Sequence, residues 1–214
     1  MVGPVKRTYD SANRRSAAEG TRRRIIDEAS HLFLARGYAR TSIESIAEKA
    51  GVSPATVYKV FTNKVAIVKA VGDVAVVGDH EAVPLDERDW VRSAMTETDA
   101  ALAVEMIVRN GVAVLARISP IIEMVSAAAL VEPQLTDLVD AGDRGRRQGF
   151  RAFVGWLHAR GQLRAGLSVD DGADVLYALQ SPQTFLTLVQ QRGWSIERFG
   201  DWLVDQVCFA LLGS

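Results

Sequence analysis

The sequence contains little cysteine, little proline and few aromatic residues. Among its 214 residues there are one cysteine, 6 prolines and 7% aromatic side chains. A single cysteine excludes a disulfide within one chain and fits a reducing cytoplasm, where Cys208 is expected to be a buried, unreactive thiol. Scarce proline and the absence of alternating apolar and polar residues argue against β-sheet, while 48% apolar residues suffice for a core. We therefore predict an all-α, cytoplasmic protein.

Long apolar runs are also absent. No run approaches the roughly 18 residues of a membrane-spanning helix, so we expect no membrane partner. The first 20 residues are basic and polar without an apolar centre, which argues against a secretory signal there. We expect residues 1–20 to form a flexible basic arm whose arginines reach phosphates or the minor groove, namely Arg7, Arg14 and Arg15.

Patterns typical of enzymes and metal sites are sparse. The three histidines stand far apart and lack the spacing of metal ligands: His31, His80 and His158. Cys208 has no histidine near it in the sequence, so nothing local indicates a cysteine nucleophile. We predict no enzymatic activity, no cofactor and no metal.

Residues 41–64 predict two short helices joined by a tight turn. Thr41 followed by Glu44 has the pattern of a capping box at the start of the first helix. Gly51 suits the positive φ at that helix's end. Ser53 and Pro54 then begin the second helix as its N-cap and first residue. This is a helix–turn–helix, whose second helix can enter a DNA major groove.

The second of these helices, about residues 54–61, presents its polar side outward. We assign Ala55 and Thr56 to base edges, through a methyl and a hydroxyl group. Phosphate contacts, which position a protein without reading sequence, are assigned mainly to five other residues, although Lys59 suits either role. These five are Thr41, Ser42, Tyr58, Lys59 and Lys64, and with Ser53, Pro54, Ala55 and Thr56 they form the predicted DNA-binding set.

Charge is segregated along the chain. Residues 1–71 hold 13 Lys and Arg against 6 Asp and Glu, a net charge of +7. Residues 72–214 hold 12 against 20, a net charge of −8. A basic head suits a polyanion such as DNA, and an acidic body avoids it. A merely solvated surface would explain the charges but not their segregation.

Residues from about 22 to 69 resemble the N-terminal region of the TetR family of bacterial transcriptional regulators. The matching pattern reads R-I-I-D-E-A-x-x-L-F-x-x-x-G-Y-x-x-T-S-I-x-x-I-A-x-x-A-G-V-S-x-x-T-V-Y-x-x-F-x-x-K. The resemblance implies an all-α chain with an N-terminal three-helix DNA-binding head that contains the helix–turn–helix. A C-terminal helical body for ligand binding and dimerisation would follow. We expect a basic arm over 1–20, the head over 21–71 and the body over 72–214.

The resemblance also implies a function. A homodimer would bind a pseudo-palindromic DNA operator, most simply as a repressor, and a small-molecule effector would release it. Two alternatives stay open from sequence: a DNA-binding regulator without an inducer, and an activator.

The body is predicted to be helical throughout. After a helix over 64–79 and a loop at 80–89, we expect helices at about 86–97, 100–117, 120–130, 134–161, 168–192 and 195–212. Gly142, Gly145 and Gly149 recur on one side of the long helix, although each costs about 1 kcal/mol relative to alanine. Close approach of another helix, a wall that leaves room for a ligand, and a kink are the three explanations.

The last two helices resemble those through which many TetR-like regulators pair as a four-helix bundle. The residues assigned to that dimer interface are Leu179, Leu186, Val189, Leu203 and Val207, with intramolecular core as the alternative.

For the effector we expect a pocket of methionine and aromatic side chains, which suit an adaptable apolar site. Charged residues are sparse between Ala100 and Leu130, so a mostly apolar molecule with one or two polar groups is favoured. The assigned residues, for each of which plain core is the alternative, are Met95, Met106, Met124, Phe150, Phe153, Trp156 and Tyr177.

Overall fold

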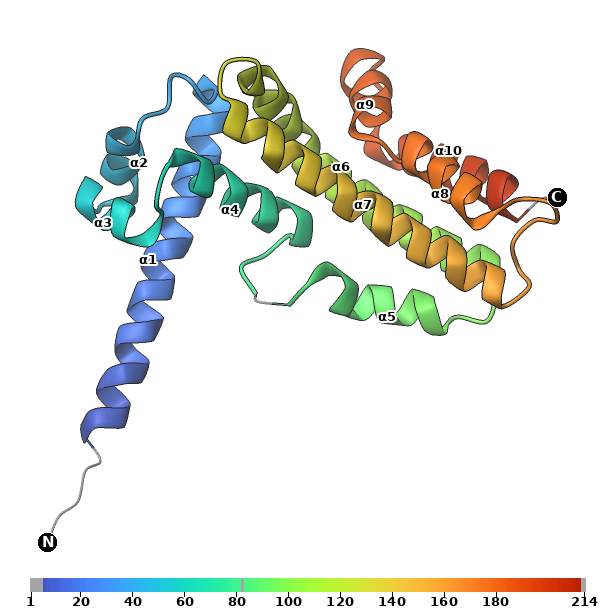
Figure 1. Cartoon of the computed structure of the whole chain (residues 1–214), viewed down its shortest axis with the longest axis horizontal. Helices are drawn as coiled ribbons and strands as arrows, with labels where there is room; N and C mark the ends of the chain where they lie inside the picture. The colour runs from blue at the N-terminus through green and yellow to red at the C-terminus, as the bar shows by residue number, and fades with distance from the viewer. Residues whose placement is uncertain (1–5, 82, 213–214) are drawn as a thin grey trace, which may run out of the picture. The chain divides into compact units, whose positions relative to one another are not determined.

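The computed structural model describes residues 6–81 and 83–212, with side chains from Asn13 onward (Figure 1). Within these residues every regular element is helical, which confirms the predicted all-α fold. The chain divides into two compact units, the first ending at Asp73 and the second beginning at Val74. We refer to the first unit as the head and to the second as the body.

The head consists of three helices and the first part of a fourth (Figure 1). Helix α1 spans Lys6–Arg36, α2 spans Ile43–Ala50, α3 spans Pro54–Val60, and α4, which continues into the body, spans Lys64–Val77. Helix α2 packs on α1, and α3 packs on α2. The apolar side chains that follow helical spacing in these elements are buried: Ile25, Phe33, Ile43, Ile46, Ala47, Ala50, Val57 and Ile67.

Helix α1 begins earlier than the sequence predicted. It starts at Lys6, so residues 6–20 are helical where a flexible arm was expected over 1–20, and the preceding residues lie outside the described part of the chain. Between Lys6 and Arg36 there is no proline and one glycine, Gly20, and this composition favours helix. Arg14 and Arg15 are exposed, whereas the side chain of Arg7 lies outside the described residues.

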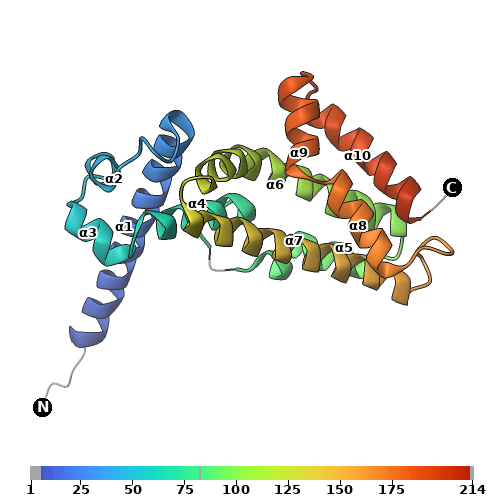
Figure 2. The same ribbon diagram turned by 45° about the horizontal axis from the view of Figure 1, so that its top comes forward.

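The body is built around one long helix, α6. The elements after α4 are the 3₁₀ turn η1 (Leu85–Glu87), α5 (Asp89–Thr96), α6 (Ala100–Ala129), α7 (Pro133–Ala159), α8 (Val169–Leu179), α9 (Pro182–Phe185), the π-helical segment η2 (Leu186–Gln191) and α10 (Ile196–Leu211). Helix α6 packs against α5, α7, α9 and α10, and α7 also packs against α8. In both ribbon views α6 and α7 run side by side (Figures 1 and 2).

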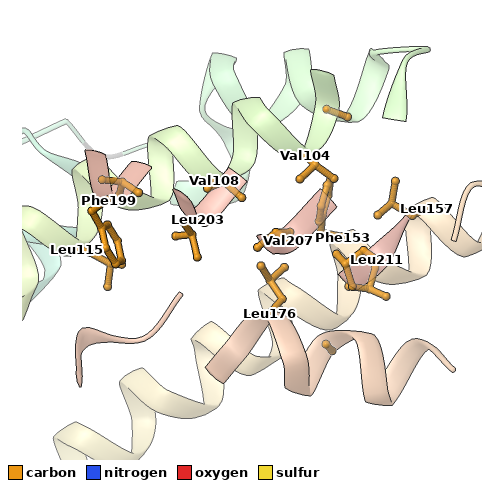
Figure 3. Close-up of a cluster of buried hydrophobic side chains, with 14 of the residues drawn as sticks. Val104, Val108, Leu115, Phe153, Leu157, Leu176, Phe199, Leu203, Val207 and Leu211 are labelled. Atoms are coloured by element: carbon orange, nitrogen blue, oxygen red, sulfur yellow. The ribbon is translucent and has the colours of Figure 1, made fainter. Parts of the chain in front are cut away.

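One apolar cluster joins four helices of the body. Figure 3 shows side chains from α6, α7, α8 and α10 pointing toward one another. Burying each large aliphatic side chain contributes about 1.5–3 kcal/mol to the free energy of unfolding. The members labelled there are Val104, Val108, Leu115, Phe153, Leu157, Leu176, Phe199, Leu203, Val207 and Leu211.

Two helix boundaries in the body differ from the prediction. Helix α6 is continuous through Pro120, where two helices were expected. Proline removes one backbone hydrogen bond, but the buried Leu115 and Ile121 on either side hold the helix together. The predicted helix at 168–192 instead ends at Leu179. Pro182 disfavours a helical backbone conformation at Ser181, and the Ser181 side chain caps the next helix.

Helix α6 also corrects the expectation about membrane-spanning segments. Among the described residues it is the one helix long and apolar enough to cross a bilayer, with a mean hydropathy of 1.6 over its most apolar window. A core helix passes the same test, and α6 is packed against four neighbouring helices.

The glycine row of α7 lies on an exposed face. A Cβ atom added at Gly142, Gly145 or Gly149 would meet nothing within 4 Å. Within the described part of this chain, the row therefore serves neither a close helix approach nor the wall of a cavity.

Candidate functional site

The first helix of the helix–turn–helix is capped by Ser42. Its side chain accepts a hydrogen bond from the Ser45 backbone N–H at 3.2 Å, and the Ser45 hydroxyl accepts one from the Ser42 backbone N–H at 3.2 Å. The predicted box of Thr41 and Glu44 is therefore wrong by one residue. The Glu44 carboxylate lies in the first turn, where hydrogen bonds from its own backbone N–H and the Ser42 hydroxyl lower its pKa.

The turn and the start of α3 follow the prediction. Gly51 ends α2 with φ +66°, and its N–H donates to the last turn of that helix. The Ser53 side chain accepts a hydrogen bond from the Thr56 N–H at 3.1 Å, and Pro54 occupies the first turn of α3. These local signals decide the geometry with which α3 leaves the turn.

Helix α3 presents a small exposed face. Ala55 and Lys59 are exposed, as is 53% of Tyr58, while Val57 is turned into the core. Thr56 is half-buried, and its hydroxyl lies 2.9 Å from the Ser53 hydroxyl. The exposed set thus combines a methyl group, a phenol and a cation, which are suited to base edges and phosphates.

Two residues predicted to contact phosphates instead hold the head together. Thr41 is 0% exposed, and its hydroxyl is hydrogen-bonded to the Gly37 carbonyl at 2.9 Å and lies 3.2 Å from that of Leu32. The Lys64 ammonium donates to the carbonyl groups of Tyr38 at 3.0 Å and Thr41 at 3.1 Å. The prediction for Thr41 is wrong because its side chain is buried, and the Lys64 charge is used for contacts within the chain.

Arg22 is a residue that the sequence analysis did not assign. Its guanidinium lies 4.5 Å from the centre of the Phe61 ring, at the end of α3. This contact links α1 to the end of the helix that carries the exposed face. Residues this far apart in sequence give no local signal, so only the folded chain shows it.

Most of the predicted effector residues lie in or beside the core cluster of the body. Phe153 belongs to the core cluster and stacks on Trp156, with ring centres 5.8 Å apart. Met95, Phe150 and Trp156 pack against the same cluster. Met106 and Met124 are half-buried on α6. For Phe153 the structure thus favours the alternative of plain core.

Tyr177 serves a contact between helices α7 and α8. Its hydroxyl donates to the Asp143 carboxylate, and the Arg146 guanidinium lies 4.0 Å from the centre of its ring. Arg146 also donates to the Gln180 carbonyl at 3.1 Å, at the end of α8. Tyr177 is therefore held by polar partners rather than left facing a pocket.

A cavity of about 280 Å³ lies elsewhere in the body. It is bounded by the end of α4, the following loop, η1, α5 and one face of α6. Arg88 closes one side through a two-pronged ion pair with Asp79, at 2.7 and 2.9 Å. Hydrogen bonding to Arg88 lowers the pKa of Asp79. The full lining is Val76, Val77, Asp79, Leu85, Arg88, Trp90, Asn110, Ala113, Val114 and Arg117.

The predicted dimer interface divides into two groups. Leu203 and Val207 are both 0% exposed and belong to the core cluster, so their assignment to an interface is wrong. Leu179, Leu186 and Val189 are half-buried, which leaves part of each side chain accessible, and Leu179 and Val189 pack against that cluster.

Comparison with known proteins agrees with the geometry of the head. The sequence profile described as "Bacterial regulatory proteins, tetR family" matches residues 25–71, which include α2, α3 and their turn. The HTH-type transcriptional regulator YdeS of Bacillus subtilis (strain 168) is 28% identical over 159 residues, covering 74% of this chain and 75% of YdeS. Residues 25–71 form a DNA-binding domain of the TetR family.

Solved structures of repressors extend the likeness in fold beyond the head. NalD of Pseudomonas aeruginosa, the secondary repressor of the MexAB-OprM multidrug efflux pump, superposes with a TM-score of 0.67 at 18% identity, covering 92% of this chain and 98% of NalD. SmeT, the repressor of the Stenotrophomonas maltophilia efflux pump SmeDEF, gives 0.64 at 19% identity, covering 89% and 90%. At these identities the likeness is one of fold. The TetR-type domain and the likeness to YdeS show that the chain is a transcriptional regulator and not an enzyme.

Proposed function

We propose that this regulator is a cytoplasmic repressor that binds a pseudo-palindromic operator as a homodimer and is released by a small molecule. The exposed face of α3 carries this proposal. Ala55, Tyr58 and Lys59 project from a short helix whose start is capped by Ser53. Two copies would place their α3 helices in successive major grooves, roughly 34 Å apart, so the operator repeats would share that spacing.

The proposed DNA contacts of the head fall into contacts with phosphates and contacts with base edges. Lys59 and Tyr58 offer a cation and a hydroxyl to phosphates, as do Ser42 and Ser53 at the exposed helix starts. Ala55 offers a methyl group to a thymine methyl. Pro54 is exposed in the first turn and adds apolar contact. The Thr56 hydroxyl lies against the Ser53 hydroxyl, so the methyl group of Thr56 is the part that would contact DNA.

A small-molecule effector is supported by similar proteins and by the cavity in the body. SmeT has been solved in complex with triclosan. A cavity of about 280 Å³ is just below the usual range of roughly 300–1,000 Å³, which suits a compact molecule. An effector that binds the body better in one spacing of the two heads would shift the dimer away from the operator-binding spacing.

Genomic footprinting followed by binding to the recovered site tests this proposal. We expect protection of a two-fold related sequence, and loss of that binding when Ala55, Tyr58 and Lys59 are replaced together by aspartate, glutamate and glutamate. The matched control is Lys69→Glu, because Lys69 lies on α4 and pairs with Asp73 at 2.6 Å. Equal binding by the triple variant and the wild type contradicts the proposed face. Increased transcription on binding in vitro contradicts repression and supports an activator.

A further inference from the structure

The cavity in the body contains one cation that no carboxylate neutralises. Arg88 is paired, since Asp79 holds it with two hydrogen bonds and Glu81 lies 3.6 Å away. Arg117, which also lines the cavity, forms no ion pair with any carboxylate of the described residues. The lining therefore carries an excess of positive charge at Arg117.

The Arg117 guanidinium is fixed in place by the end of α4. It donates to the carbonyl groups of Ala75 at 2.8 Å and Val76 at 3.2 Å. Gly78, with φ +90°, makes room for it, because a Cβ there would lie 3.1 Å from the guanidinium carbon. Of the five N–H groups of a guanidinium, these contacts use two, so three remain for a bound molecule.

The other lining residues indicate the chemistry of the part of the bound molecule that does not contact Arg117. Asn110 lies two turns before Arg117 on the same face of α6. Its amide N–H₂ donates to the Met106 carbonyl at 2.8 Å, and its amide oxygen can accept a hydrogen bond from a bound molecule. The lining also includes the apolar side chains of Val114 and Leu85 and the aromatic ring of Trp90.

We infer that the cavity binds a compact organic anion, whose carboxylate is held by Arg117 and whose apolar part packs on Trp90, Leu85 and Val114. Charge-assisted and two-pronged hydrogen bonds make arginine the preferred partner of a carboxylate. The inference rests on the proposed function, since it specifies the chemical class of the effector. It also limits size, because the cavity is small.

Three probes of nearly equal size and shape test the charge requirement: benzoate, benzamide and benzamidinium. Each is titrated at constant ionic strength into the full-length wild-type protein, and the indole N–H resonance of Trp90 is followed by NMR after assignment with Trp90→Phe. We expect saturable, millimolar binding of benzoate, at least about tenfold weaker binding of benzamide, and none of benzamidinium. No saturable shift with benzoate, or equal shifts with all three probes, overturns the inference.

Two variants of Arg117 test whether its guanidinium holds the carboxylate of the bound anion. Arg117→Gln should weaken benzoate binding at least about tenfold, while Arg117→Lys, which keeps the charge but not the fork, should fall between it and the wild type. Arg144→Gln is the matched control, because Arg144 is exposed on α7 and does not line the cavity. Benzoate binding that survives Arg117→Gln, or that is lost equally in Arg144→Gln, overturns the assignment. Operator binding without any probe is measured in parallel, so failure of the proposed function is seen separately from failure of this inference.

Discussion

The Lys64 ammonium lies 3.9 Å from the centre of the Tyr38 ring and donates a 3.0 Å hydrogen bond to the carbonyl group of the same residue. A lysine at the start of α4 thus holds the segment that connects α1 to α2. Together with the contact to the Thr41 carbonyl, this arrangement fixes α2 relative to α4 within the head. The cation stabilises the domain that presents α3 rather than the protein–DNA complex.

Replacing Lys64 should therefore destabilise the head. For Lys64→Met we expect a loss of about 2 kcal/mol in the free energy of unfolding, because two charge-assisted hydrogen bonds and a cation–π contact are removed. Urea unfolding followed by circular dichroism measures this loss. The control is the exposed Lys59→Met, which should change stability by less than about 0.5 kcal/mol. Equal stability of both variants would show that the Lys64 contacts contribute nothing.

Lys59 should contribute to DNA affinity instead. Lys59→Ala should weaken operator binding and reduce the slope of log affinity against log salt concentration by about one unit, since one phosphate loses its cation. Binding is measured by fluorescence anisotropy over a series of salt concentrations. Lys69→Ala serves as the control, because that ammonium already pairs with Asp73. A slope that is unchanged in Lys59→Ala would remove Lys59 from the phosphate contacts.

Substitutions at Ala55 and Thr56 should affect operator binding in different ways. Ala55→Ser alters the surface offered to a base edge, so it should shift preference at one position of each half-site by about 1–3 kcal/mol. Thr56→Val replaces the hydroxyl that lies against Ser53 and keeps the methyl group, so it should weaken binding to all sites alike. Binding to every single-base variant of the operator distinguishes the two patterns. If Thr56→Val changes base preference and Ala55→Ser does not, their roles are reversed.

Leu186 and Leu203 should respond differently to a buried charge. Leu186→Glu should give a folded monomer that binds the operator weakly, because an unpaired charge in an apolar interface costs several kcal/mol. Leu203→Glu should unfold the body, since that side chain is 0% exposed within one chain. Analytical ultracentrifugation and circular dichroism of each variant separate loss of assembly from loss of fold. Dimers of wild-type mass from both Leu186→Glu and Val189→Glu would place the interface elsewhere.

The contact between Asp143 and Tyr177 should make stability depend on pH. Burial raises the pKa of Asp143, but hydrogen bonds from Tyr177 and Arg146 and the charges of Arg146 and Arg147 outweigh it and leave the pKa lowered. A lowered pKa in the folded state contributes stability above the unfolded value of about 3.9, and this is lost as the pH falls through the folded value.

Asp143→Asn should accordingly cost about 1 kcal/mol in the free energy of unfolding near neutral pH, a small figure because the carboxylate is partly exposed. The difference from the wild type should shrink below about pH 4, where the carboxylate becomes protonated. Urea unfolding at a series of pH values measures it, with Asp140→Asn as the exposed control on the same helix. A difference that does not vary with pH would mean that the Asp143 charge is not involved.

The sequence by itself determined the helix–turn–helix, because each signal acts within a few residues. Gly51 ends one helix through its own backbone conformation, and Ser53 caps the next through a bond to a residue three positions away. Ile46 and Val57, which follow helical spacing in α2 and α3, are likewise buried. Such local preferences hold in any tertiary context that tolerates the helices.

The tertiary structure decided which polar residues bind partners within the chain and which apolar residues stay accessible to solvent. Lys64 and Thr41 resemble surface residues in sequence, yet their partners include residues up to 26 positions away. Leu203 and Leu186 have the same side chain, but Leu203 is completely buried in the core cluster and Leu186 is only half-buried. The cavity depends on Arg117 reaching the end of α4, 41 and 42 residues earlier in the chain. Burial and long-range hydrogen bonds are properties of the folded chain, because they arise from segments that sequence spacing does not relate.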